Sequence, residues 1–285
     1  MEDNTIIAEE KKTTKCLNCG TEFQGKFCPE CGQKADTGRF TIRFIFQNFI
    51  LGILSNDGGV WFTIKNLFTR PGQMMIDIIN GKRKSYFSPF PMLFLTLSLY
   101  IIIFSFTGSK IKVYEKVFSE DDVTEVIEFD DSVSTDLREA RLDYVRHNVR
   151  WLIRFYDNNY TIIFIITIPF YIFSARICFG KNNRKKYYRG EYCIPIIYSL
   201  IMVVLYQCLT SISFYFSESV FDFMEDLKMW VTIAAFTLCF KKMMGFSYLK
   251  MAWRSFLTYV FYFGIMAFLI LCVIIFYAVY VEAFV

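Results

Sequence analysis

Histidine is nearly absent from this sequence, which contains a single one, His147. It lies between Thr135 and Asp157, where apolar residues recur at helical spacing. A satisfied or solvent-facing histidine on an amphipathic helix is therefore favoured over a catalytic one. The sequence also lacks a glycine-rich phosphate loop and a nucleophile motif. No set of residues that could carry out a reaction is found, so we expect that the protein is not an enzyme.

An apolar run at the N-terminus is also lacking. Residues 1–15, MEDNTIIAEEKKTTK, are polar and are expected to form a disordered N-terminus without a cleaved secretory signal. Of the nine cysteines, four fall within residues 16–31 and the other five are scattered singly. In a segment without an export signal, four clustered cysteines indicate a metal site more than disulfides.

The clustered cysteines form two pairs in the segment CLNCGTEFQGKFCPECGQ, residues 16–33. Each C-x-x-C pair places two thiolates on one tight turn, and four thiolates complete a tetrahedral site with no open position. The pattern predicts a structural zinc held in a ribbon at residues 16–34, although thiolate ligation alone leaves iron open. Two disulfides are the alternative. The predicted metal ligands are Cys16, Cys19, Cys28 and Cys31.

Long uncharged stretches follow the cysteine segment, and a helix of about 20 apolar residues crosses a bilayer core. Five stretches are predicted to be spans: Tyr86–Thr107, Tyr160–Ala175, Tyr192–Phe216, Met229–Phe240 and Ser255–Val281. The fourth is short, so a re-entrant or interfacial helix is its alternative. The predicted fold is an all-α polytopic membrane protein, with about five transmembrane helices in residues 86–285 and a small N-terminal zinc ribbon.

Charge alternates between the segments that connect these spans. Basic residues cluster before the first span, between the second and third, and after the fourth, whereas residues 120–131 and 218–226 are acidic. Lysine and arginine near span ends favour the cytosolic side. This pattern predicts five crossings with a cytosolic N-terminus, an external loop or helix at residues 108–158, and the C-terminus outside.

Residues 35–85 contain two segments, 40–54 and 61–68, that are rich in aromatic side chains and sparse in charge. The segments 40–54 and 61–68 are predicted to be short helices, broken at residues 55–59 (SNDGG) and at residues 70–72 (RPG). One interpretation places them on the cytosolic membrane surface, near basic side chains that contact anionic lipid headgroups. The other is a soluble helical hairpin packed on the bundle. The basic run KNNRKKYYRG at 181–190 lies beside a span, which favours anionic lipid, and no nucleic-acid partner is expected.

A family resemblance rests on the cysteine segment together with TIKNLFTRPG and GKRKSYFSPFPMLFL, which precede and enter the first span. In this combination, the first third of the chain resembles an uncharacterised bacterial family, domain-of-unknown-function family 3667. The resemblance implies a multi-pass protein of the bacterial inner (cytoplasmic) membrane with an N-terminal zinc ribbon. It implies no known reaction.

Two functions from different classes fit these features. The first is a membrane scaffold or sensor whose zinc ribbon docks a cytosolic protein partner. The second is a transporter or lipid-handling protein with a polar path between spans. The predicted spans contain no ionisable residue away from their ends, and hydrogen bonds between helices explain polar residues such as Thr96 and Gln207. A tightly packed bundle would favour the first function, and a deep polar cavity between the first and third spans the second.

Overall fold

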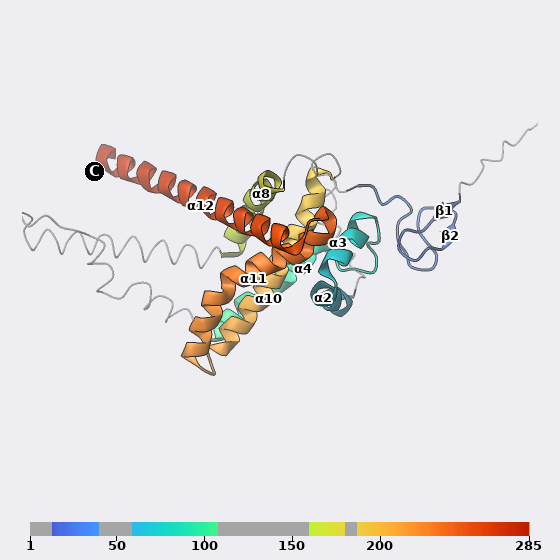
Figure 1. The fold of residues 1–285 in the computed structure, drawn as a ribbon, viewed down its shortest axis with the longest axis horizontal. Coiled ribbons are helices and arrows are strands. Elements are labelled where there is room, and N and C mark those ends of the chain that lie inside the picture. The colour runs from blue at the N-terminus through green and yellow to red at the C-terminus, as the bar shows by residue number, and fades with distance from the viewer. Residues whose placement is uncertain (1–12, 40–58, 108–159, 180–186, 285) are drawn as a thin grey trace, which may run out of the picture.

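The computed structural model of the chain describes residues 13–39, 59–107, 160–179 and 187–284 (Figure 1). Two predicted segments lie outside these residues: the helix at 40–54 and the external segment at 108–158, which includes His147. Of the predicted disordered N-terminus at 1–15, the structure describes only residues 13–15. The described part consists of a small cysteine ribbon and a set of helices.

The ribbon has very short strands. Strand β1 (Thr14–Lys15) pairs antiparallel with β2 (Glu22–Phe23), and an isolated bridge joins Phe27 to Lys34. Each cysteine pair therefore sits at the tip of its own narrow hairpin. The ribbon's buried apolar core consists only of Cys16, Phe23 and Cys28, with Cys31 and Ala35 against it.

Two short helices lie between the ribbon and the first apolar helix. Helix α2 spans Val60–Thr69 and α3 spans Pro71–Ile79. Arg70 breaks the helical path with φ −147° and ψ 54°, and Pro71 starts α3 at a position where its missing N–H is not needed. The break is therefore one residue long, because Gly72 already belongs to α3.

Gly72 also lets α3 approach a neighbouring helix closely. A Cβ at this position would lie 3.0 Å from Lys242 Cβ and 3.2 Å from the carbonyl oxygen of Leu238, both on helix α11 (Glu218–Met244). A larger residue at Gly72 would push the two helices apart.

The remaining helices are long and apolar. They are α4 (Pro89–Thr107), α8 (Tyr160–Cys178), α10 (Cys193–Ser213), α11 and α12 (Tyr248–Phe284), with a 3-10 turn η1 (Arg189–Tyr192) before α10. Among the described residues, three helices are long and apolar enough to cross a membrane: Pro89–Thr107, Gly190–Ser213 and Tyr248–Cys272. Helix α8 contributes a shorter apolar stretch, Ile166–Cys178. These helices indicate a membrane protein; the predicted count of five spans is supported for three.

The fourth predicted span is part of a continuous helix of 27 residues. Helix α11 ends at Gly245, whose φ of 70° closes the helix in the left-handed conformation that glycine adopts easily. At about 1.5 Å per residue its length is about 40 Å, enough to cross a bilayer core. Acidic and basic side chains occupy its two ends, and for this reason α11 is not among the three apolar candidates.

Helix α10 lies at the centre of the bundle, where 83% of its apolar stretch is buried, against 11% for α12. It runs parallel to α4, because Tyr198 OH donates to the carbonyl of Phe87 and Tyr215 OH to that of Phe106. It runs antiparallel to α11, because Ser199 Oγ contacts the carbonyl of Ala235 while Tyr206 OH donates to that of Met224. Figure 1 shows α10 and α11 side by side.

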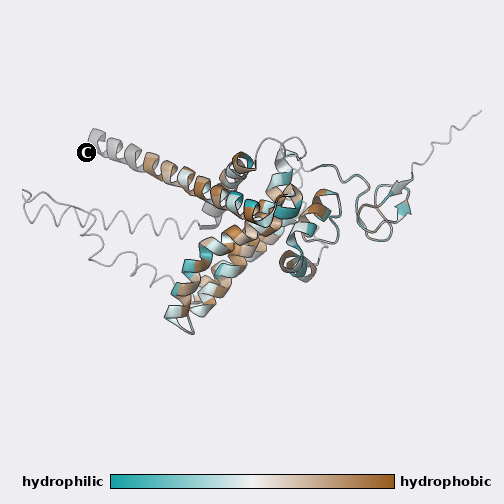
Figure 2. Cartoon of the chain, viewed as in Figure 1, coloured by the Kyte–Doolittle hydropathy of each residue, from teal (hydrophilic) through white to brown (hydrophobic). Residues whose placement is uncertain are grey.

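Helices α8 and α12 form a second antiparallel pair. The rings of Tyr171 and Tyr262 stack with centroids 3.6 Å apart, and Arg254 donates to the carbonyl of Cys178 at 2.8 Å. Figure 2 shows mostly brown, apolar residues along α12 where it leaves the bundle. Much of α12 is therefore apolar surface, as expected of a helix that faces lipid.

Candidate metal centre

The two cysteine turns repeat one backbone geometry. In the first, Gly20 N–H donates to the carbonyl of Cys16 at 2.9 Å and Cys16 N–H to that of Thr21 at 2.8 Å. In the second, Gly32 N–H donates to Cys28 and Cys28 N–H to Gln33, both at 2.8 Å. Each turn has a positive φ at its glycine, 86° at Gly20 and 70° at Gly32, which a glycine adopts without a Cβ clash.

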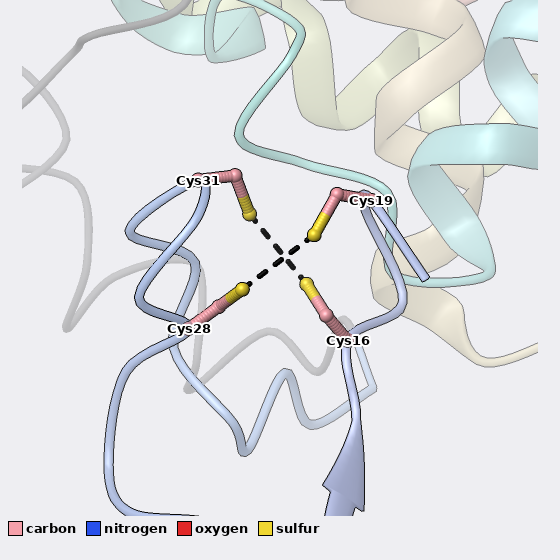
Figure 3. Close-up of side chains that lie close together, drawn as sticks. All are labelled: Cys16, Cys19, Cys28 and Cys31. Carbon is pink, nitrogen blue, oxygen red and sulfur yellow. Dashed lines mark hydrogen bonds between the residues drawn. The ribbon is translucent and has the colours of Figure 1, made fainter. Parts of the chain in front are cut away.

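These turns bring the four predicted ligands together. The Sγ atoms of Cys16, Cys19, Cys28 and Cys31 all lie within 4.8 Å of one another, so the cluster could hold a metal ion. Figure 3 shows the four side chains converging from two turns of the ribbon, with Cys16 facing Cys31 and Cys19 facing Cys28. Both of these Sγ–Sγ distances are 3.5 Å, too long for a disulfide bond, and all four thiols are free. The structure therefore contradicts the alternative of two disulfides.

The thiols differ in acidity before any metal is bound. Hydrogen bonds from the Thr21 hydroxyl and its backbone N–H lower the pKa of Cys19 to about 6, because they stabilise the thiolate. Burial raises the pKa of Cys28 to about 11. Cys19 is therefore the first of the two to offer a thiolate, and Cys28 must release its proton when a metal binds.

Two phenylalanines, Phe23 and Phe27, lie between the cysteine pairs, and their sequence position suggests both as apolar cover for the cluster. Phe23 is buried beside Cys16 and Cys28, but Phe27 is 60% exposed, so only Phe23 covers it. The bridge from Phe27 to Lys34 explains this, because Phe27 and Cys28 are consecutive and extended residues point to opposite faces.

Gln33 joins the ribbon to the α3–α4 loop, residues 80–88. It directly follows the second turn and is 5% exposed. Its Nε2 donates to the carbonyl of Gly81 at 2.9 Å, and its Oε1 accepts from the backbone N–H groups of Arg83 at 3.1 Å and Lys84 at 3.2 Å. One side chain therefore satisfies three backbone groups of the loop.

The first cysteine turn contacts the same loop. Asn18, between Cys16 and Cys19, accepts hydrogen bonds through Oδ1 from the hydroxyl of Ser85 at 2.9 Å and its N–H at 3.3 Å. Leu17 packs on Gly81, where φ is 102° and an added Cβ would come within 2.6 Å of Leu17 Cδ1. The residues beside the four clustered cysteines are thus also the residues that hold the loop.

The segment after the ribbon makes an ion pair with a helix far along the chain. Arg39 donates from Nε to Glu191 Oε1 at 2.8 Å and from Nη2 to Oε2 at 2.9 Å, and its guanidinium lies 4.1 Å from the centroid of the Tyr188 ring. The Glu191 side chain, in η1, is fully buried, so this bidentate contact neutralises a buried carboxylate. Hydrogen bonds from Arg39 to Glu191 raise the pKa of the guanidinium further.

Arg83 completes this contact region. Its Nη2 donates to the carbonyl of Gly38 at 2.7 Å. Burial lowers its pKa to about 10, and the carboxylates of Glu191 and Asp36 act in the opposite direction. The sequence predicted the four cysteines but none of Asn18, Gln33 or Arg39. The only sequence feature that could have pointed to these three residues is their nearness to the cysteines. Their hydrogen-bond partners lie about 50 to 150 residues away in the chain, so no local pattern identifies them.

Comparison with known proteins supports the resemblance noted in the sequence. Residues 57–101 match the model of a family described as "Protein of unknown function (DUF3667)". The match covers α2, α3, the α3–α4 loop and the first part of α4, so it contains the loop that holds the ribbon. No curated protein and no solved structure matches the chain.

Proposed function

We propose that this protein is a scaffold or sensor of the bacterial inner membrane, in which zinc organises a cytosolic ribbon that rests on the protein's own membrane domain. The observation that carries the proposal is the contact of Asn18 and Gln33, which flank the cysteines, with the α3–α4 loop. A ribbon docked in this way makes the metal part of the membrane domain's surface. The orientation follows the basic residues predicted to face the cytosol.

Zinc is the metal that fits this donor set best. A tetrahedral site with Zn–S bonds of about 2.3 Å separates its sulfurs by about 3.8 Å. Two of the observed Sγ–Sγ distances are 3.5 Å and all of them are within 4.8 Å, so shifts of up to about 1 Å bring the sulfurs to that value. Four cysteine ligands leave no position for water or substrate, so the metal would have a structural role.

Metal dependence follows from the size of the ribbon. Its buried apolar core of three residues is too small to hold the two turns together without a metal. Loss of zinc would therefore disorder Asn18 and Gln33 and release the loop, while the helical bundle keeps its own apolar contacts. That response is what a sensor requires. A protein partner that binds the docked ribbon would then associate only with the zinc-loaded form.

Metal analysis tests the zinc itself. We expect one zinc per chain in the purified protein, lost when Cys28→Ser and Cys31→Ser are combined. The matched control replaces two cysteines outside the cluster, Cys178→Ser with Cys272→Ser, and keeps the metal. Absence of zinc from the wild type, or zinc unchanged in the cluster variant, refutes the metal assignment.

Hydrogen exchange and affinity purification test the role. In membranes, the amides of residues 81–85 should exchange faster in the cluster variant than in the control. A protein captured by the wild type and the control but not by the cluster variant supports the scaffold. If exchange is unchanged, docking does not depend on the metal and the sensor proposal is wrong.

The alternative, a transporter or lipid-handling protein with a polar path between spans, has less support. The face of α4 toward the bundle carries Met92, Leu93 and Leu97, all at most 1% exposed. The Thr96 hydroxyl donates to carbonyls of its own helix, and Ser199 and Thr210 of α10 do the same. These hydroxyls satisfy helix carbonyls in place of lining a path.

A further inference from the structure

Helix α2 turns aromatic side chains outward and polar ones toward the protein. Trp61 is 82% exposed and Phe68 is 55% exposed. On the opposite side Thr63 and Asn66 are buried, together with Leu67. A helix on a water-exposed surface usually turns its polar residues to the water and its apolar residues to the protein. In α2 several of these positions are exchanged: two aromatic residues face outward and two polar residues face the protein.

The outward side is a continuous face by helical geometry. Trp61, Lys65 and Phe68 are spaced four and three residues apart, which places them on one side of the helix. Lys65 is exposed between the two rings, and α2 has no acidic residue. Aromatic rings combined with a basic side chain are typical of helices that lie in the headgroup region of a membrane.

Hydrogen bonds fix this orientation. Thr63 Oγ1 donates to the carbonyl of Gly59 at 3.0 Å and accepts from the N–H of Phe87 at 2.8 Å. Asn66 donates to the carbonyl of Phe62 at 2.7 Å and accepts from Arg70. Of these, only the bond between Thr63 and Phe87 joins α2 to another part of the chain. Rotating α2 to bury Trp61 would break it and leave the N–H of Phe87 without that partner, which is unfavourable.

The position of α2 is at the end of an apolar span. Phe87, which contacts Thr63, is two residues before the start of α4, and the rings of Phe62 and Tyr86 lie 5.4 Å apart. Helix α4 exposes Leu95 and Leu99 along its own length. The outward face of α2 is thus fixed at the point where a membrane-crossing helix would leave the bilayer.

We propose that the outward face of α2, formed by Trp61, Lys65 and Phe68, lies against the membrane surface at the start of α4 and binds anionic lipid headgroups. The two rings enter the boundary between headgroups and acyl chains, and the Lys65 ammonium pairs with headgroup phosphate. Lipid suits this face better than a protein partner because the face has no acidic residue and is held at a fixed place beside a span. The site is separate from the metal centre.

Fluorescence of Trp61 tests the proposal in the full chain. The variant with Trp151→Phe, Trp230→Phe and Trp253→Phe retains only this tryptophan and is reconstituted in vesicles of phosphatidylcholine with phosphatidylglycerol. We expect blue-shifted emission, loss of most of the signal when bromine is carried near the glycerol end of the lipid chains, and little quenching by aqueous iodide. Strong iodide quenching without quenching by brominated lipid overturns the proposal and leaves the face open for a protein partner.

A second measurement does not depend on that triple variant. In the otherwise wild-type chain, Trp61→Phe should remove part of the quenching by shallow bromines. The charge is tested separately, in the variant that retains only Trp61, by Lys65→Glu, which should make Trp61 more accessible to iodide when the lipid is anionic. The matched control is Lys26→Glu, which makes the same charge change on the ribbon. Equal effects of the two lysine variants, or unchanged quenching in Trp61→Phe, contradict the proposal.

Discussion

Replacing Gln33 by alanine should release the ribbon from the α3–α4 loop without disturbing the metal ligands. The change removes three hydrogen bonds, one to Gly81 and one each from Arg83 and Lys84. Each contributes on the order of 1 kcal/mol, the usual net value for a hydrogen bond within a protein. The docked state should therefore weaken by about 3 kcal/mol, which is about 100-fold in its equilibrium constant.

Hydrogen exchange of the Arg83 and Lys84 amides, followed by mass spectrometry on the membrane-embedded protein, measures this change. Both amides donate to Gln33, so their exchange should accelerate by up to about the same factor if opening of the docked state limits it. Zinc content should be unchanged. The control is Gln24→Ala, which removes an exposed glutamine of the same ribbon whose side-chain hydrogen bond to Thr13 is long at 3.4 Å. Equal exchange in the two variants would show that Gln33 does not hold the loop.

Three further predictions concern other parts of the chain. Gly81→Ala should undock the ribbon, because the new Cβ clashes with Leu17 and the backbone φ is already unfavourable for alanine. Gly25→Ala is the control: its φ is 116° and no atom lies within 4 Å of an added Cβ, so it adds strain without a clash. Amide exchange in the loop should therefore accelerate in Gly81→Ala and not in Gly25→Ala. Burial and the hydrogen bond to Asp77 raise the pKa of Tyr86 to about 12, so its contribution to stability is complete below about pH 10 and lost as pH rises through 12; absorbance at high pH, compared with Tyr86→Phe, checks this. Of two reporters fused after Val285, the one that is active only outside the cytosol should give a signal. A signal from the reporter that is active only in the cytosol refutes five crossings.

Local features of the chain could be predicted from the sequence because they depend on neighbouring residues. The cysteine turns and their glycines need only the C-x-x-C-G spacing, and the structure has both glycines at positive φ. The helix predicted at 61–68 is present as α2, and the break after it falls at Arg70. For the same reason the apolar stretches of α4, α10 and α12 are recognisable as candidate spans.

Contacts between distant residues could not be predicted. Nothing in the residues around Gln33 or Arg39 specifies a partner at 81–84 or at 191, and a pattern of hydrophobicity carries no such information. The two interpretations of residues 61–68 were also not exclusive, because α2 packs on the bundle with one face and exposes aromatic rings with the other. Helix α11 is longer than the span predicted at Met229–Phe240, because a hydropathy pattern ends where the charged residues at the two ends of the helix begin.

The parallel pairing of α4 with α10 has a consequence for biosynthesis. The two tyrosine contacts that join them link residues 111 and 109 positions apart in the chain. At translation rates of about 5–20 residues per second, α4 would leave the ribosome roughly 5–20 seconds before its partner. During that interval Met92, Leu93 and Leu97 can face lipid at little cost, and the Thr96 hydroxyl is already bonded within its own helix. The face that later becomes the core is therefore one that a newly inserted helix can expose to the bilayer while the rest of the protein is made.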